Sequence, residues 1–253
     1  MLIKNELMIQ KKRINEKTLN VVRLDKLWEM PNSNIKNYKI REYNELIRKN
    51  PRAVYSAIAS PYSQSDLIVI ELSKLYGKQA VIYYTKKDTT KYADIDDVEL
   101  VYLGGRLSIT KNLAKKQFRT KYSNGYFVSA EGLDGDVFRS VSKDASEWEF
   151  LNDQNIHINV GSGMTALSIM HGFLKTNIKP KKIICYQTGM ELLFDKYRGV
   201  TGLFNLKIVK LPWKYEDKIE YEDFNPIYDA KVLKYLTTND FEDEDYFLNI
   251  GSV

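Results

Sequence analysis

A short turn rich in glycine carries the clearest chemical signal in the sequence, and it stands between an apolar run of strand length and a run with helical spacing. Its residues are Gly161, Ser162, Gly163, Met164 and Thr165. Glycine lets the backbone turn tightly against a ligand, and a helix start offers backbone N–H groups and the positive end of the helix dipole. This pattern predicts a site for one phosphate group. The alternative is a plain strand-to-helix turn in which Ser162 or Thr165 caps the helix.

Other common sites have no support in the sequence. The turn is not followed by Gly-Lys-Ser or Gly-Lys-Thr, and it lacks the Gly-x-Gly-x-x-Gly spacing of a dinucleotide site. The two histidines, His157 and His171, have no Cys or His at metal-ligand spacing, and no nucleophile elbow is present. Neither a zinc site nor a histidine-based triad is therefore expected.

Several segments, in order along the chain, resemble those of the fold type II (tryptophan-synthase-β-like) pyridoxal-phosphate enzymes, nearest the aminocyclopropane-carboxylate deaminase and D-cysteine desulfhydrase branch. The glycine turn is similar to the Gly-Ser-Gly-Gly-Thr phosphate loop of that family. Five further segments resemble motifs of the family. Arg-Leu-Asp-Lys-Leu (23–27) resembles Arg-x-Asp-x-Leu, Tyr-Lys-Ile-Arg-Glu-Tyr (38–43) resembles Asn-Lys-x-Arg-Lys-Leu, and Ser-Gln-Ser (63–65) resembles Ser-Asn-x. Asn-Pro-Ile-Tyr-Asp-Ala-Lys (225–231) resembles Asp-Pro-Val-Tyr-Glu-Gly-Lys, and Phe-Leu-Asn-Ile-Gly-Ser (247–252) resembles a late strand ending in His-Thr-Gly-Gly.

The resemblance implies pyridoxal 5′-phosphate as the cofactor and gives individual residues a role toward it. Lys39 matches the lysine that forms the Schiff base, and Lys36 is its rival, disfavoured because Arg41 stands at the right spacing after Lys39. Tyr228 would stack near the ring or transfer a proton. Asp229, in place of a glutamate, would face the pyridine nitrogen, although the local pattern is equally typical of a helix cap.

The segment 63–65 would contact both the cofactor and the substrate. Gln64 replaces an asparagine beside the O3′ oxygen of the cofactor, and its amide N–H could still donate there from a longer arm. Ser63 is preferred over Ser60 and Ser65 for binding a substrate carboxylate. A simple turn around Pro61 is the alternative.

The function that the resemblance implies is a pyridoxal-phosphate enzyme acting on an amino acid or amino-acid-like substrate by elimination, deamination or β-replacement. The chain departs from the family pattern at Met164, at Tyr38 and at the ending 249–252, and it is shorter than typical members. Two alternatives therefore stay open. One is an enzyme that tailors an amino-acid-modified nucleotide or DNA base, and the other is a non-catalytic protein that keeps the fold.

The elements that would position these residues alternate between strands and helices. Strands are expected at 54–59, 80–84, 156–160, 183–186, 206–211 and 247–250, and helices at 65–76, closed by Gly77, and at 165–175. This alternation predicts βαβ units and mostly parallel sheets. With the resemblance, it predicts a two-lobed, three-layer α/β/α fold. Residues 1–51 and 125–253 would form the larger cofactor-binding lobe and 52–124 a smaller inserted lobe, with the cofactor between them.

Composition limits the remaining possibilities. No apolar run approaches the roughly 20 residues that span a bilayer, and the N-terminus does not resemble a secretory signal. The single cysteine, Cys185, lies in an apolar run and is expected to be buried and inert, which favours a cytoplasmic location, or the host cytoplasm if the usage of Lys, Asn and Tyr reflects a phage genome.

The positions of the charged residues along the chain give little information about the substrate. The net charge is +5, with basic residues spread along the chain, so a small-molecule substrate is expected and a nucleic-acid-linked substrate is the alternative. The acidic tract 240–245 is interpreted as a solvated loop or helix start. A homodimer is expected from the resemblance alone.

Overall fold

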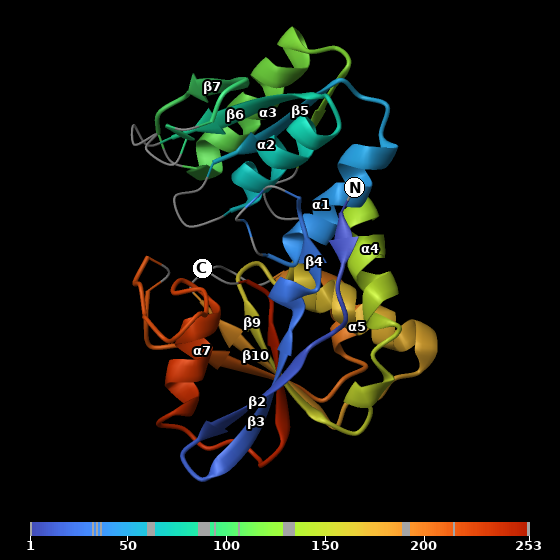
Figure 1. Ribbon diagram of the computed structural model, residues 1–253, viewed down its shortest axis with the longest axis vertical. Coiled ribbons are helices and arrows are strands. Elements are labelled where there is room, and N and C mark those ends of the chain that lie inside the picture. Colours follow the sequence, from blue (N-terminus) through green and yellow to red (C-terminus); the bar gives the residue numbers. More distant parts are fainter. Residues whose placement is uncertain are drawn as a thin grey trace. The chain divides into compact units, whose positions relative to one another are not determined.

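The structure, a computed structural model, describes residues 2–31, 33, 35, 37–59, 64–85, 92–93, 95–105, 107–128, 135–188, 193–214 and 216–251. These residues form two compact units (Figure 1): a smaller unit of residues 42–137 and a larger unit of residues 2–41 and 138–253. The predicted inserted segment, 52–124, lies inside the smaller unit. None of the described helices is long and apolar enough to cross a membrane.

The larger unit contains a six-stranded sheet in the order β11-β10-β9-β12-β3-β2. The strands are β2 (Ile9–Ile14), β3 (Lys17–Arg23), β9 (Asn155–Val160), β10 (Lys182–Gln187), β11 (Leu206–Lys210) and β12 (Asp245–Asn249). All neighbours pair in parallel except β2 and β3, which form an antiparallel pair. The carboxyl ends of the parallel strands therefore meet along one edge, which is where such sheets usually bind ligands.

Helices cover both faces of this sheet because residues alternate between the faces along each strand. On one face, Ile156 and Ile158 of β9 pack with α5 (Met164–Thr176) and with the end of α4 (Gly135–Ala145). On the other face, Val21 of β3 and Phe247 of β12 pack with α7 (Asp229–Leu236). The shorter elements of this unit are β1 (Ile3–Lys4), β4 (Trp28–Glu29), η1 (Leu24–Lys26), η3 (Glu149–Leu151), η4 (Leu193–Tyr197) and α6 (Arg198–Thr201).

The smaller unit contains a parallel four-stranded sheet in the order β7-β6-β5-β8. Its elements are β5 (Val54–Ile58), β6 (Gln79–Tyr84), β7 (Val98–Tyr102), β8 (Gly125–Phe127), α2 (Ser65–Leu75) and α3 (Leu107–Lys121). Phe118 of α3 packs against Val81 and Tyr83 on one face, and α2 lies against β5 and β6. Helix α1 (Lys39–Lys49) starts in the larger unit and continues into the smaller one.

The predicted fold class, α/β with mostly parallel sheets in three layers, is confirmed. Every strand and helix predicted from the sequence is present, with ends that differ by at most two residues. Gly77 ends α2 as predicted: its φ of +61° is favourable for glycine, and the N–H of Lys78 donates to the carbonyl of Ser73 at 2.8 Å.

The interpretation of 240–245 as a solvated loop is wrong for its last residue. Asp245 is buried at the start of β12, where Oδ2 lies 2.8 Å from Nε2 of His157 and Oδ1 accepts a hydrogen bond of 2.9 Å from Nδ2 of Asn155. Nδ1 of His157 lies 2.8 Å from the hydroxyl group of Tyr186. A row of polar side chains thus crosses one face of the larger sheet, and it accounts for His157 without a metal.

Candidate functional site

The glycine turn connects the carboxyl end of β9 to the first residue of α5. Gly163 is the N-cap of α5, with a φ of +88°, and a Cβ added there would come within 2.6 Å of Phe194 Cε1. The alternative in which Ser162 or Thr165 is the N-cap is therefore wrong. Because glycine has no side chain, the capping residue itself cannot accept hydrogen bonds from the first N–H groups of the helix. A phosphate group is a suitable acceptor at such a helix start.

The two glycines of the turn predict different effects of alanine. Gly163→Ala forces alanine into the left-handed backbone conformation that Gly163 adopts, and its Cβ would clash with Phe194. It is therefore expected to lower the free energy of unfolding by about 1–3 kcal/mol. Gly161→Ala places a Cβ at an ordinary 3.8 Å from Tyr228 Cε1 and should leave stability within about 0.5 kcal/mol. Urea unfolding of both variants measures the contrast; equal losses of stability would contradict this geometry.

Tyr228 lies beside the glycine turn. Its Cε1 atom is the one that a Cβ at Gly161 would meet. The tyrosine is the N-cap of α7, and Oδ1 of Asn225 accepts hydrogen bonds from the backbone N–H groups of Ile227, at 3.0 Å, and of Tyr228, at 3.2 Å. This local turn fixes the backbone that carries Tyr228 and Asp229.

Asp229 is the most perturbed carboxyl group at this edge of the sheet. It is 1% exposed, and Oδ2 accepts a hydrogen bond of 3.0 Å from the N–H of Gly251. Burial raises its pKa to about 8, because the charged form is desolvated; the nearby Asp25 raises the pKa further, and Arg23 opposes the shift. Asp229 does not act as a side-chain cap of α7, since its carboxyl group bonds to the end of β12 instead.

Lys39 is tied to the same edge of the sheet by its neighbours. Its N–H donates to Oδ1 of Asn37 at 3.0 Å, and the N–H of Tyr38 donates to the carbonyl of Ile250 at 2.8 Å. Asn37 in turn forms an isolated antiparallel bridge with Gly251. Because Gly251 also bonds to Asp229, the half-buried Lys39 starts its helix close to the carboxyl group of Asp229.

These contacts join four of the predicted residues within the larger unit. Lys39 connects through Asn37 to Gly251, and Gly251 connects to Asp229. Tyr228, the neighbour of Asp229 in the chain, lies against Gly161 of the turn. The amine-bearing segment and the glycine turn therefore lie at one edge of one sheet, although they are far apart in the sequence.

Tyr38 departs from the family asparagine, and the structure gives a reason. The side chain is fully buried, and its hydroxyl group donates to Oδ2 of Asp144 in α4 at 3.0 Å. Nε of Arg41 lies 3.6 Å from the same carboxylate, and the guanidinium group lies over the ring of Trp28, 4.8 Å from its centroid. Burial raises the pKa of Asp144, while Arg41 and Tyr38 oppose the shift. This cluster anchors the first turn of α1.

Two buried asparagines at the strand ends were missed by the sequence analysis. Leu248 of β12 pairs with Ile158 of β9, so the residues that follow them, Asn249 and Asn159, are neighbours across the two strands. Among the described residues, neither polar atom of the Asn249 side chain has a hydrogen-bond partner, nor have Nδ2 of Asn159 and Oδ1 of Asp229. An unpaired buried polar group costs about 1–3 kcal/mol, so these atoms indicate a place for water or a polar ligand.

The remaining predicted residues are placed only in part. Gln64 and Ser65 stand at the start of α2 in the smaller unit, where the carbonyl group of Gln64 accepts the N–H of Ile68 at 2.9 Å. Ser60, Ser63 and Lys36 lie outside the described residues.

Cys185 is fully buried, and burial raises its thiol pKa, so the expectation of a buried thiol is confirmed. Within the described ranges no group of His, Cys, Asp and Glu could hold a metal ion.

Comparison with known proteins identifies the fold. No family model and no curated protein matches the chain. A solved structure of an ACC deaminase homologue matches with a TM-score of 0.73 at 13% identity, over 98% of this chain and 90% of that one. Maize serine racemase matches with 0.69 at 12% identity, over 98% and 90%, and cysteine synthase from Entamoeba histolytica with 0.68 at 13%, over 98% and 86%. The predicted tryptophan-synthase-β-like fold type II is therefore confirmed.

Proposed function

We propose that the chain is a pyridoxal-phosphate-dependent enzyme that acts on an amino acid or an amino-acid-like substrate by elimination, deamination or β-replacement. The observation that carries this proposal is the run of contacts from Lys39 through Gly251, Asp229 and Tyr228 to the glycine turn. This run of contacts links an amine-bearing residue, a buried acid, a phenol and the glycine turn, which together would suit the cofactor. The fold shared with a deaminase homologue, a racemase and a synthase supports the same function.

The residues present fit pyridoxal 5′-phosphate. When bound, this cofactor supplies an electron sink for the bonds at the substrate Cα. Lys39 would hold its aldehyde carbon, and residues 161–165 would bind its phosphate group. The roles that the resemblance gives to Gln64, toward the O3′ oxygen, and to Ser63, toward the substrate carboxylate, stay predictions. The unpaired polar atoms of Asp229, Asn249 and Asn159 fit a site that receives a polar ring, because each of them lacks a partner among the described residues.

Asp229 would hold a proton at a defined atom. Its raised pKa of about 8 keeps the carboxyl group protonated at neutral pH. Oδ2 accepts the N–H of Gly251, so the proton would reside on Oδ1, the oxygen without a partner among the described residues. This oxygen is the one that would face the ring nitrogen. A proton held there strengthens electron withdrawal by the ring.

Tyr228 would move a proton at its hydroxyl oxygen, beside the glycine turn. Replacing Tyr228 with phenylalanine should lower kcat by about 100-fold, the lower end of what a general acid or base contributes. Cofactor affinity and stability should stay close to those of the unmodified protein, because the ring that contacts Gly161 is kept. Steady-state kinetics and a cofactor titration measure the split. Tyr246→Phe, a change on β12 in the same unit, is the matched control, and an unchanged kcat in Tyr228→Phe would exclude the role.

The function itself is tested by spectroscopy and a substrate panel. The purified protein mixed with cofactor should absorb in the visible, and borohydride should fix the cofactor on Lys39, as peptide mapping would show. The panel consists of both enantiomers of serine, threonine and cysteine, with aminocyclopropane carboxylate, and the products measured are keto acid, ammonia and sulfide. Absence of the visible band and of the adduct would refute the proposal. A stable adduct without turnover of any compound would favour the non-catalytic alternative.

A further inference from the structure

Helix α3 presents an outward face with an unusual charge. Five of its 15 residues are basic and none is acidic. The basic residues are Lys111, Lys115, Lys116, Arg119 and Lys121. Ala114 and Phe118 are buried against the sheet, whereas Lys115, Lys116 and Arg119 are exposed on the opposite side of the helix. Spacings of three and four residues bring these three cations onto one face of the helix, where like charges destabilise it.

Several other exposed cations in the described part of the chain have an acidic neighbour. The pairs include Lys11 with Glu244, Lys181 with Glu242 and Arg198 with Asp195. On α3 itself, Lys121 pairs with Glu99. No described acid forms an ion pair with Lys115, Lys116 or Arg119, so the described part of the chain leaves the charge of this face uncompensated.

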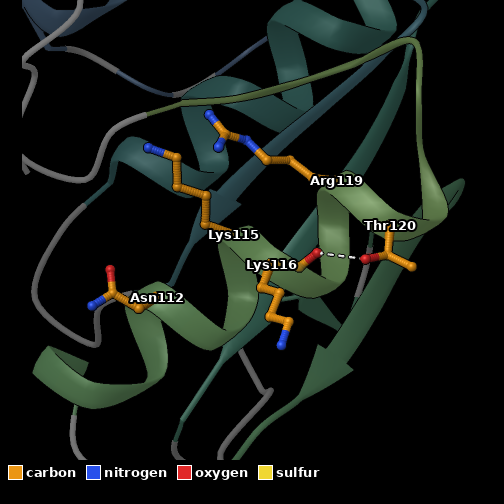
Figure 2. A pocket seen from close by; sticks show the side chains of 5 residues that line it. All are labelled: Asn112, Lys115, Lys116, Arg119 and Thr120. Atoms are coloured by element: carbon orange, nitrogen blue, oxygen red, sulfur yellow. Dashed lines mark hydrogen bonds between the residues drawn. The ribbon is translucent and has the colours of Figure 1, made fainter.

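The same face holds a depression with a volume of about 360 Å³. Figure 2 shows that Lys115 and Arg119 lean to one side of it and Lys116 to the other. Asn112 and Thr120, at its ends, add polar side chains. All the lining residues come from a single helix, so the depression is open to solvent.

We propose that this face of α3 binds double-stranded nucleic acid through its phosphate backbone. An open surface buries too little of a small anion to bind it tightly, whereas a polyanion gains affinity because condensed counterions are released. Asn112 and Arg119 are about 10 Å apart along the helix axis, and a duplex carries one charge per roughly 1.7 Å, so several phosphates lie within reach.

The composition of the face also predicts how it would bind. The exposed described residues of α3 include no aromatic side chain on which a base could stack. Contacts to phosphates carry no sequence information, so binding should be independent of base sequence. The inference does not depend on the cofactor, because α3 belongs to the smaller unit and the run of contacts from Lys39 to the glycine turn lies in the larger one.

The test is fluorescence anisotropy of a labelled 20-bp DNA duplex with the full chain, between 50 and 200 mM salt. Three phosphate contacts predict a slope of log K against log salt of about −2.7, or roughly a 40-fold loss of affinity over this range. The triple variant Lys115→Gln, Lys116→Gln and Arg119→Gln should bind at least about 10-fold more weakly at 50 mM salt, with a slope near zero.

A matched control removes the same charge elsewhere. Lys11→Gln, Lys181→Gln and Arg198→Gln together neutralise three exposed cations of the larger unit that are ion-paired, and they should leave the affinity within about twofold. Equal weakening in both triple variants would overturn the proposal, because net charge alone would then explain binding. The proposal would also be overturned if the unmodified protein did not bind the duplex, or if it bound phosphatidylserine vesicles instead of the duplex.

The cofactor spectrum keeps this test separate from the proposed function. The α3 variant should retain the visible absorption of the unmodified protein. If the chain binds the duplex but shows no cofactor absorption, the proposed enzymatic function is refuted and the proposal that α3 binds nucleic acid stands.

Discussion

Replacing Lys39 with alanine is expected to abolish borohydride fixation of the cofactor and to lower kcat/KM by at least about 1,000-fold. The reason is chemical: one amine would hold the cofactor and afterwards move protons, so its loss removes both a covalent and a general acid–base contribution. The structure places Lys39 at the first position of α1, where its backbone is bonded to Asn37 beside Gly251. Mass spectrometry of the reduced protein and steady-state kinetics measure the two effects.

Lys49→Ala is the matched control for this experiment. Lys49 ends the same helix, is exposed and pairs with Glu45, so its loss should leave both the adduct and kcat/KM close to those of the unmodified protein. Retention of the adduct in Lys39→Ala would transfer the role to another lysine. Lys36 is the first to replace next, since it stands three residues before Lys39 in the sequence.

Asp229→Asn should stabilise the protein at alkaline pH while it weakens catalysis. Burial raises the pKa of Asp229 from its ordinary value of 3.8 to about 8. Between these two values the folded protein binds more protons than the unfolded chain, so this residue lowers stability as the pH rises. The effect is absent below pH 3.8 and complete above pH 8, where it is on the order of 5 kcal/mol.

Asparagine removes this pH dependence because it has no proton to lose. Its side-chain oxygen can still accept the N–H of Gly251, so the contact with the end of β12 is kept. The free energy of unfolding of the two proteins should be similar near pH 4 and should differ by about 5 kcal/mol in favour of the variant at pH 8. Its kcat should fall, since an amide cannot hold the proton that strengthens the ring as an electron sink.

Urea unfolding without cofactor at pH 4, 6 and 8 measures the stability difference. Asp195→Asn, a change of an exposed carboxylate in the same unit, is the control and should show the pH dependence of the unmodified protein. If Asp229→Asn showed that same dependence, then Asp229 would be ionised in the folded state. The proposed proton on Oδ1 would then be ruled out.

The sequence predicted best those elements whose signal is local. β9 reads as a short apolar run, and α5 has apolar residues at helical spacing, so both were found within one residue of their ends. Gly77 marked the end of α2 because only a positive φ satisfies that turn. Helices α1, α3 and α4 were not predicted, although Ile40, Tyr43 and Ile47 of α1 stand at helical spacing and that segment was interpreted only through its motif.

The contacts among the proposed site residues join distant segments, and these contacts could not be predicted from the sequence. The order of the motifs was enough to select Lys39, the glycine turn, Tyr228 and Asp229. Nothing in the local sequence shows that Tyr38 donates a hydrogen bond to Asp144, since these residues belong to separate helical segments. The adjacency of Asn159 and Asn249 likewise follows from the pairing of β9 with β12, and this pairing joins residues about ninety positions apart.

The sheet order has a consequence for the time course of folding. β12 lies between β3 and β9, so the early strands and the middle strands of the larger unit cannot join until this late segment has been made. The smaller unit, in contrast, is one continuous stretch of chain, and all its strands lie between Val54 and Phe127. Contacts of long sequence separation form slowly. During synthesis the smaller unit can therefore fold first, while the apolar segments of the larger unit stay exposed, and open to aggregation, until β12 has been made.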